Sequence, residues 1–245
     1  MMQFFRYLCL LLVTAQIVSC SKQSETLNST NAKELYPLKI GKTFTYRLDS
    51  TVVATFGASL QKKSYLAKDS IESSFLDNQG RQSYRIFRYI TDTLASKPYR
   101  YSDTYYAVID SNKIEYINNN LRFITLVNPV SVNTTWKGNS YINTTTNADN
   151  FFLNNWEYKY QNIDNPFTVK KGIINNTVTI LQQDESSAAS FDPNFYYNKA
   201  YSVEVYAKGI GLIYKDFLHY TYQVTPSRYY ETGSYGIRLS LVDYK

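Results

Sequence analysis

The chain has 245 residues with a formal net charge of +6, 25 tyrosines and 13 phenylalanines, but only two cysteines and one histidine. So few cysteines and histidines exclude a zinc site built from those ligands, and they leave little material for a Ser-His-Asp triad or a Cys-His nucleophile. The basic residues are spread along the chain rather than gathered in a stripe, which argues against a nucleic-acid partner.

The first nineteen residues have the build of a secretory signal. Arg6 supplies the basic region, an apolar run extends from Leu8 to Val18, and the small residue Ser19 precedes the expected cleavage point. The apolar run is shorter than the roughly 20 residues that a membrane-spanning helix needs. We therefore expect residues 1–19 to be a signal peptide rather than a transmembrane helix.

The four residues Ile17 to Cys20 resemble the lipobox of bacterial lipoproteins. The resemblance implies that the thiol of Cys20 receives a diacylglyceryl group, that palmitate is among the acyl chains, and that Cys20 becomes the first residue of the mature chain. The alternative is a plain signal peptide with an accidental cysteine. Because Cys9 lies in the signal, no disulfide is possible after cleavage, and stability has to come from a hydrophobic core.

Residues 20–36 are polar and rich in Ser, Thr and Asn, so we predict a lipidated Cys20 followed by a flexible tether. Residues 37–245 contain no Pro- or Gly-rich linker, which predicts a single domain. The predicted location is the outer membrane, reached through the lipid. Glu25 is the only acidic residue between Cys20 and Asn31, and this leaves open whether the domain faces the periplasm or the cell surface.

The body of the chain alternates between apolar and polar residues with the period of a β-strand. Phe44, Tyr46 and Leu48 share one face of such a strand, and the same alternation recurs towards the C-terminus. Hairpin turns are predicted at residues 110–113 and 118–120, where Asp, Asn and Ser cluster. Helical periodicity is absent apart from a short helix that residues 186–200 could form.

These patterns predict an all-β fold with one antiparallel sheet, because parallel strands would need crossover helices. Many strands carry aromatic residues on both faces, so the sheet should curl on itself as a half-barrel or barrel, with a sandwich as the alternative. A curled sheet has a concave face. Lined by tyrosine and phenylalanine, that face could hold an apolar ligand or could be a packed core.

Three stretches resemble a group of uncharacterised lipoproteins of the Bacteroidetes. They are YPLKIGKTFTYRLDS (36–50), LRFITLVNPVSVNTTWKGNSY (121–141), and TVTILQQDE with YSVEVYAKGIGLIYKDF (within 177–217). The resemblance implies a β-rich domain on a lipid anchor and no assigned activity.

The sequence shows no metal-site pattern, no cofactor motif and no candidate catalytic residue. Gly209 and Gly211 could cradle a phosphate only if a helix followed, so a bend before a strand is the better interpretation. His219 is predicted to be half-exposed on a strand. An enzyme would require several distant carboxylates to converge in one cleft, and the candidates are Asp69, Glu72, Asp184, Glu185 and Glu204.

Three Asp-Ser/Thr-apolar triplets begin at Asp49, Asp69 and Asp92. They resemble the O-glycosylation sequons of exported Bacteroidetes proteins. The alternative is that each aspartate forms an ordinary Asx turn at the end of a strand.

Two functions remain in contention, and an enzyme is a distant third. The first is a carrier that holds a lipid or another apolar small molecule within the curled sheet. The second is a structural lipoprotein whose exposed tyrosine-rich face docks on an envelope protein. A cavity would favour the first function, whereas a solid core with an exposed aromatic patch would favour the second.

Overall fold

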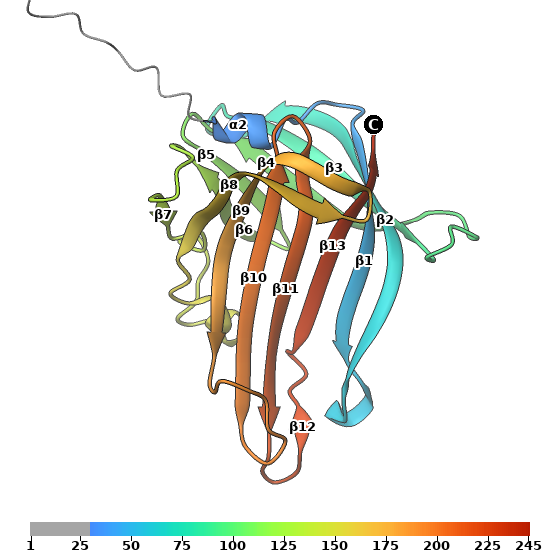
Figure 1. Cartoon of the computed structure of the whole chain (residues 1–245), viewed down its shortest axis with the longest axis vertical. Helices are drawn as coiled ribbons and strands as arrows, with labels where there is room; N and C mark the ends of the chain where they lie inside the picture. The colour runs from blue at the N-terminus through green and yellow to red at the C-terminus, as the bar shows by residue number, and fades with distance from the viewer. Residues whose placement is uncertain (1–29) are drawn as a thin grey trace, which may run out of the picture.

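The computed structural model describes residues 30–245, and these form a 13-stranded antiparallel sheet (Figure 1). The strands are β1 (Thr43–Val53), β2 (Leu60–Leu76), β3 (Gln82–Thr91), β4 (Arg100–Ile109), β5 (Lys113–Asn118), β6 (Leu121–Val127), β7 (Thr135–Trp136), β8 (Tyr158–Val169), β9 (Gly172–Ser186), β10 (Tyr197–Ala207), β11 (Gly211–Gln223), β12 (Tyr229–Tyr230) and β13 (Tyr235–Tyr244). The helical segments are α2 (Ala32–Leu35), η1 (Thr55–Gly57) and η2 (Ala148–Leu153). None of these helices is long and apolar enough to cross a membrane.

The sheet curls until its two ends meet. The strand order is β6-β5-β4-β3-β2-β1-β13-β11-β10-β9-β8-β7, with β12 paired to β11 beside this path. At the seam, the Ile124 N–H donates to the carbonyl of Gly138 at 2.8 Å, and Trp136 Nε1 donates to the carbonyl of Ile124 at 2.8 Å. The sheet is therefore nearly closed and barrel-like. The prediction of one curled antiparallel sheet is confirmed, and the sandwich alternative is wrong.

Local turn chemistry behaves as the sequence predicted at both hairpins. The Asp110 N–H donates to the carbonyl of Lys113 between β4 and β5. Asn119 and Asn120 both adopt positive φ, 48° and 61°, in the turn between β5 and β6. Asparagine tolerates this left-handed conformation better than most residues, so the turn follows from the Asn run. Residues 187–196, where a helix was possible, form a loop.

The bend at Gly209 and Gly211 joins β10 to β11, with φ of 78° and 123° at the two glycines. A strand follows directly, so the predicted bend is confirmed and a phosphate cradle at a helix N-terminus is not formed. Of the three aspartates in sequon-like triplets, only Asp92 makes an Asx turn, accepting from the Leu94 and Ser96 N–H groups. Asp49 and Asp69 lie inside β1 and β2, so the turn interpretation is wrong for them.

The helix α2 covers one end of the barrel, the upper end in Figure 1. Its Ala32 and Leu35 are buried, as two residues three apart on one helical face would be. The Ala32 N–H donates to Asn128 Oδ1 after β6 at 2.9 Å, and the Gly209 N–H donates to the carbonyl of Glu34 at 2.8 Å. The cap thus ties together two sides of the sheet. The expected tether over residues 20–36 is too long at its C-terminal end, because Ala32–Tyr36 packs on the domain.

Candidate ligand cavity

A cavity of about 370 Å³ lies inside the curled sheet. Strands β1–β6, β8–β11 and β13 contribute to its wall, as does Tyr36 from the capping segment. The segment that carries η2 adds Leu153 and Trp156. Ligand pockets typically measure about 300–1,000 Å³, so the space suits one small molecule. The interior is therefore not the solid core that was the alternative interpretation of the concave face.

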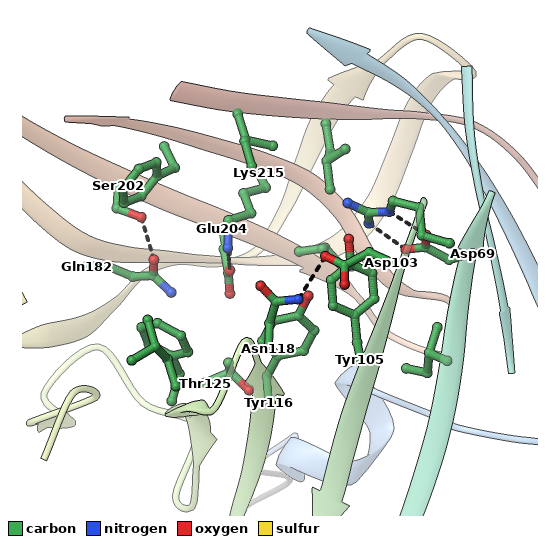
Figure 2. Close-up of a pocket in the computed structure, with 18 of the residues that line it drawn as sticks. Asp69, Asp103, Tyr105, Tyr116, Asn118, Thr125, Gln182, Ser202, Glu204 and Lys215 are labelled. Carbon is green, nitrogen blue, oxygen red and sulfur yellow. Dashed lines mark hydrogen bonds and ion pairs between the residues drawn. The ribbon is translucent and has the colours of Figure 1, made fainter. Parts of the chain in front are cut away.

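The inner face of the sheet carries more polar side chains than a packed core would. Eight of them form four pairs that span the cavity, and we call this set the polar belt (Figure 2). Its members are Asp69, Arg88, Asp103, Asn118, Gln182, Ser202, Glu204 and Lys215. Buried polar groups are costly unless they are hydrogen-bonded, and each member has its partner within the belt.

The first ion pair joins β2 to β3. Arg88 Nε and Nη2 donate to the two carboxylate oxygens of Asp69, both at 2.6 Å. The residues are opposite each other in the strand register and are only 7% and 8% exposed. Burial alone would lower the pKa of Arg88, but the adjacent Asp69 carboxylate outweighs burial and holds that pKa well above its usual value. The guanidinium therefore stays charged, and Arg88 also lies over the Tyr105 ring at 4.7 Å.

The second ion pair joins β10 to β11. Lys215 Nζ donates to Glu204 Oε1 at 2.8 Å, and the Tyr206 hydroxyl donates to Glu204 Oε2 at 2.8 Å. Glu204 is 3% exposed, so its carboxylate is almost wholly surrounded by protein. Both carboxylate oxygens accept a hydrogen bond, which is what makes a buried charge tolerable.

Two further hydrogen bonds complete the belt. The Ser202 hydroxyl donates to Gln182 Oε1 at 2.5 Å between β10 and β9. Asn118 Nδ2 donates to Asp103 Oδ2 at 2.9 Å between β5 and β4. Figure 2 shows Gln182 with Ser202, Glu204 with Lys215, and Asn118 with Asp103 in sequence across the cavity, followed by Asp69. The belt therefore presents hydrogen-bonding groups along its whole length.

Tyrosines fill the space between the charged pairs. The rings of Tyr105 and Tyr116 lie 5.4 Å apart, and Lys215 Nζ lies 6.0 Å from the Tyr116 ring centre. Burial raises the pKa of Tyr116 well above its ordinary value, and burial likewise raises the pKa of Tyr105. Both phenols therefore remain protonated and can donate hydrogen bonds.

Towards the strand ends next to η2, the cavity wall becomes apolar. Phe217 from β11 and Trp156 pack at a ring distance of 6.2 Å, and Leu153 lines the cavity beside them. Behind this wall Phe152 stacks on His219 at 4.1 Å. His219 is 9% exposed, so the expectation of a half-exposed histidine is wrong. The reason is that the connection between β7 and β8 covers this end of β11. Apolar–polar alternation within strands does not predict where such a connection lies.

The five carboxylates that an enzyme would have to bring together remain mostly apart. Asp69 and Glu204 both line the cavity, but each is bound to a cation. Glu72, Asp184 and Glu185 are exposed. Within residues 30–245, no group of three or more His, Cys, Asp or Glu residues could hold a metal ion. The predicted lipidation site, Cys20, lies outside the described residues.

Sequence reasoning missed the polar belt. The available signal was a charged residue two positions along the strand from residues that face the interior, so that it shares their face of the sheet. Glu204 lies two residues from Ser202 and Tyr206, and Arg88 lies two residues from Ile86, whose side chain also lines the cavity. Such a residue reveals its role only when its partner on the neighbouring strand is known.

Among the solved structures that are similar to this chain are two from Bacteroidetes. One is a "putative lipoprotein" from Parabacteroides distasonis, with 12% identity and a TM-score of 0.41. The other is a "putative exported protein with YmcC-like fold" from Bacteroides fragilis, with 11% identity and a TM-score of 0.39. Each alignment covers 86% of this chain and 98% of the other. No protein-family model and no curated protein matches the sequence. Likeness at this level carries no argument about function.

Proposed function

We propose that this chain is a lipid-anchored protein of the bacterial envelope that binds a small lipid-like molecule inside its curled sheet. The observation that carries the proposal is the cavity of about 370 Å³, whose wall combines apolar side chains with a hydrogen-bonding belt. A lumen of this size that served only as a core would leave its lining without packing partners, which is destabilising.

The anchor part of the proposal rests on the sequence Ile17 to Cys20 and on the apolar run before it. A protein held at an outer membrane by a lipid on Cys20 would lie beside a source of amphipathic molecules. We propose binding rather than catalysis, because Asp69 and Glu204 each hold a cation instead of standing free as an acid or base.

Two experiments test the two parts separately. A Cys20→Ala variant should leave the membrane fraction on cell fractionation, and retention there would contradict the anchor. For the ligand, residues 21–245 contain every residue that the structure describes. Native mass spectrometry of this chain, purified gently from an envelope-containing lysate, should show a stoichiometric bound molecule that is lost on denaturation. A clean apo mass, together with no uptake of an apolar fluorescent probe, would contradict ligand binding.

A second candidate function is docking on an envelope protein, and one surface feature favours it. Phe56, at the tip of the β1–β2 hairpin, is 97% exposed and lies beside a shallow groove that includes Tyr229 and Tyr230. A photo-crosslinking residue placed at position 56 in living cells should then give a discrete adduct that is absent when the same residue replaces Glu185. No adduct at position 56 would remove this candidate.

A further inference from the structure

The unused hydrogen-bonding capacity of the polar belt is mostly donor capacity. Arg88 uses Nε and Nη2 on Asp69, and its Nη1 has no hydrogen-bond partner within residues 30–245. Among residues 30–245, Lys215 Nζ has one acceptor, Glu204, although an ammonium carries three donors. Gln182 Nε2 and the Tyr116 hydroxyl also lack a protein acceptor among the described residues, and both line the cavity. A ligand that satisfies this belt therefore brings acceptor oxygens.

Both cations of the belt are already paired with a carboxylate. Asp69 neutralises Arg88, and Glu204 neutralises Lys215. Asp103 adds a third carboxylate, and its partner in the belt is the uncharged Asn118. An anionic head group would meet three carboxylates and no free cation, and a cationic head group would meet ammonium and guanidinium donors. Burying a charge without compensation costs several kcal/mol, so both kinds of head group are disfavoured.

The donors form a continuous row across the cavity. Arg88 lies over Tyr105, the Tyr105 ring lies 5.4 Å from the Tyr116 ring, and Lys215 lies 6.0 Å from Tyr116. Beyond this row, Phe217 and Trp156 offer an apolar wall. The cavity is thus divided into a donor-rich region and an apolar region, which is the arrangement that an amphipathic molecule needs.

Resting on the proposed function, we propose that the ligand class is an uncharged amphipath with an oxygen-rich head, as in a monoacylglycerol, rather than a fatty acid or a cationic lipid. The head accepts hydrogen bonds from Arg88, Lys215 and Tyr116, while its chain lies against Phe217 and Trp156. Asp69 and Glu204 hold the Arg88 and Lys215 donors in a fixed orientation and neutralise their charges, so each ion pair offers the ligand hydrogen bonds but no net charge.

The test compares three molecules with the same alkyl length on the chain of residues 21–245. Displacement of the neutral probe N-phenyl-naphthylamine is followed near neutral pH for monodecanoylglycerol, decanoate and decyltrimethylammonium. Monodecanoylglycerol should bind at least about tenfold more tightly than either charged molecule, which corresponds to about 1.4 kcal/mol. Equal or tighter binding of decanoate or of the cation would overturn the ligand class while leaving cavity binding intact. If the probe itself does not bind, the proposed function fails instead.

A charge variant makes the test specific for the belt. Glu204→Gln keeps the shape of the side chain but leaves the Lys215 ammonium without a counter-ion, so the preference for monodecanoylglycerol over decanoate should fall by about tenfold. Asp69→Asn should act in the same direction through Arg88, and it replaces Glu204→Gln if that variant does not fold. The matched control is Glu185→Gln, the same substitution at an exposed position on β9. An unchanged preference in both belt variants would overturn the proposal.

Discussion

The hydroxyl of Tyr160 makes two hydrogen bonds with the backbone of Val127: it accepts from the Val127 N–H at 2.9 Å and donates to the Val127 carbonyl at 2.6 Å. Val127 belongs to β6, the first strand in the strand order, and Tyr160 belongs to β8, the last but one. This side chain thus adds two hydrogen bonds to the seam beside the backbone bond from Ile124 to Gly138. Because the edge of a sheet presents unpaired backbone groups, this contact helps to close the barrel.

Tyr160→Phe should therefore weaken the seam without changing its packing. The ring stays in place, but the N–H and carbonyl of Val127 lose their partner, which costs about 1–3 kcal/mol of unfolding free energy. Urea unfolding followed by tyrosine and tryptophan fluorescence measures the loss. Tyr196→Phe, at an exposed loop position, is the control and should change stability by less than about 0.5 kcal/mol. Equal effects in the two variants would show that the seam contact contributes nothing.

The Asp69–Arg88 pair gives a second prediction. Arg88→Met should destabilise the protein by about 3–5 kcal/mol, because it leaves the Asp69 carboxylate buried without a cation. Adding Asp69→Leu to that variant should restore most of the stability, since removing both charges removes the uncompensated one. Arg85→Met, whose exposed side chain comes from the opposite face of β3, is the control. A double variant no more stable than Arg88→Met alone would contradict the argument.

The fold was predictable from the sequence because its determinants are local. Alternation identifies the strands, and Asn119 with Asn120 fixes the β5–β6 turn through their tolerance of positive φ. The pairing of the sheet ends was not predictable, since Tyr160 finds Val127 across 33 residues with no pattern linking them. The curling of the sheet was predicted only from the abundance of aromatic residues on both faces of the strands.

The cavity could be anticipated as a possibility, whereas the polar belt could not. Arg88 and Glu204 are in phase with inward-facing neighbours, but alternation places charged residues on the wet face by default, so this signal alone does not assign them to the interior. Their partners, Asp69 and Lys215, lie on neighbouring strands and become visible only once the register is known. The capping residue Leu35 was likewise missed, because four helical residues in a polar stretch carry no periodic signal.

Leu35 provides the third prediction, which concerns the cap. Its side chain is fully buried in the core cluster beneath α2, so Leu35→Ala should cost about 2–5 kcal/mol of unfolding free energy. Tyr36, the next residue, lines the cavity, so loosening the cap should also speed the release of a bound naphthylamine probe in stopped-flow measurements. Leu94→Ala, at an exposed loop position, is the control for both measurements. Faster release without loss of stability would separate the two effects, and a change in neither would contradict the role of the cap.

The fourth prediction concerns pH and the turn between β2 and β3. The Arg81 side chain and the Arg81 N–H both donate to the Asp77 carboxylate, and together they lower the pKa of Asp77 from 3.8 to about 2. A carboxyl whose pKa is lower in the folded chain takes up protons first in the unfolded chain as the pH falls. The stabilising contribution of Asp77 is therefore complete above about pH 4 and is lost as the pH falls through about 2.

Asp77→Asn should consequently be less stable than the parent chain near neutral pH, and the difference in melting temperature should shrink as the pH is lowered from about 4 to about 2. Melting temperatures measured at a series of pH values in buffers of constant ionic strength provide the test. Asp184→Asn is the control, since Asp184 is exposed near the end of β9 and forms no ion pair within residues 30–245. A difference for Asp77→Asn that stays constant throughout this range would show that the Arg81 contacts do not stabilise the ionised carboxylate.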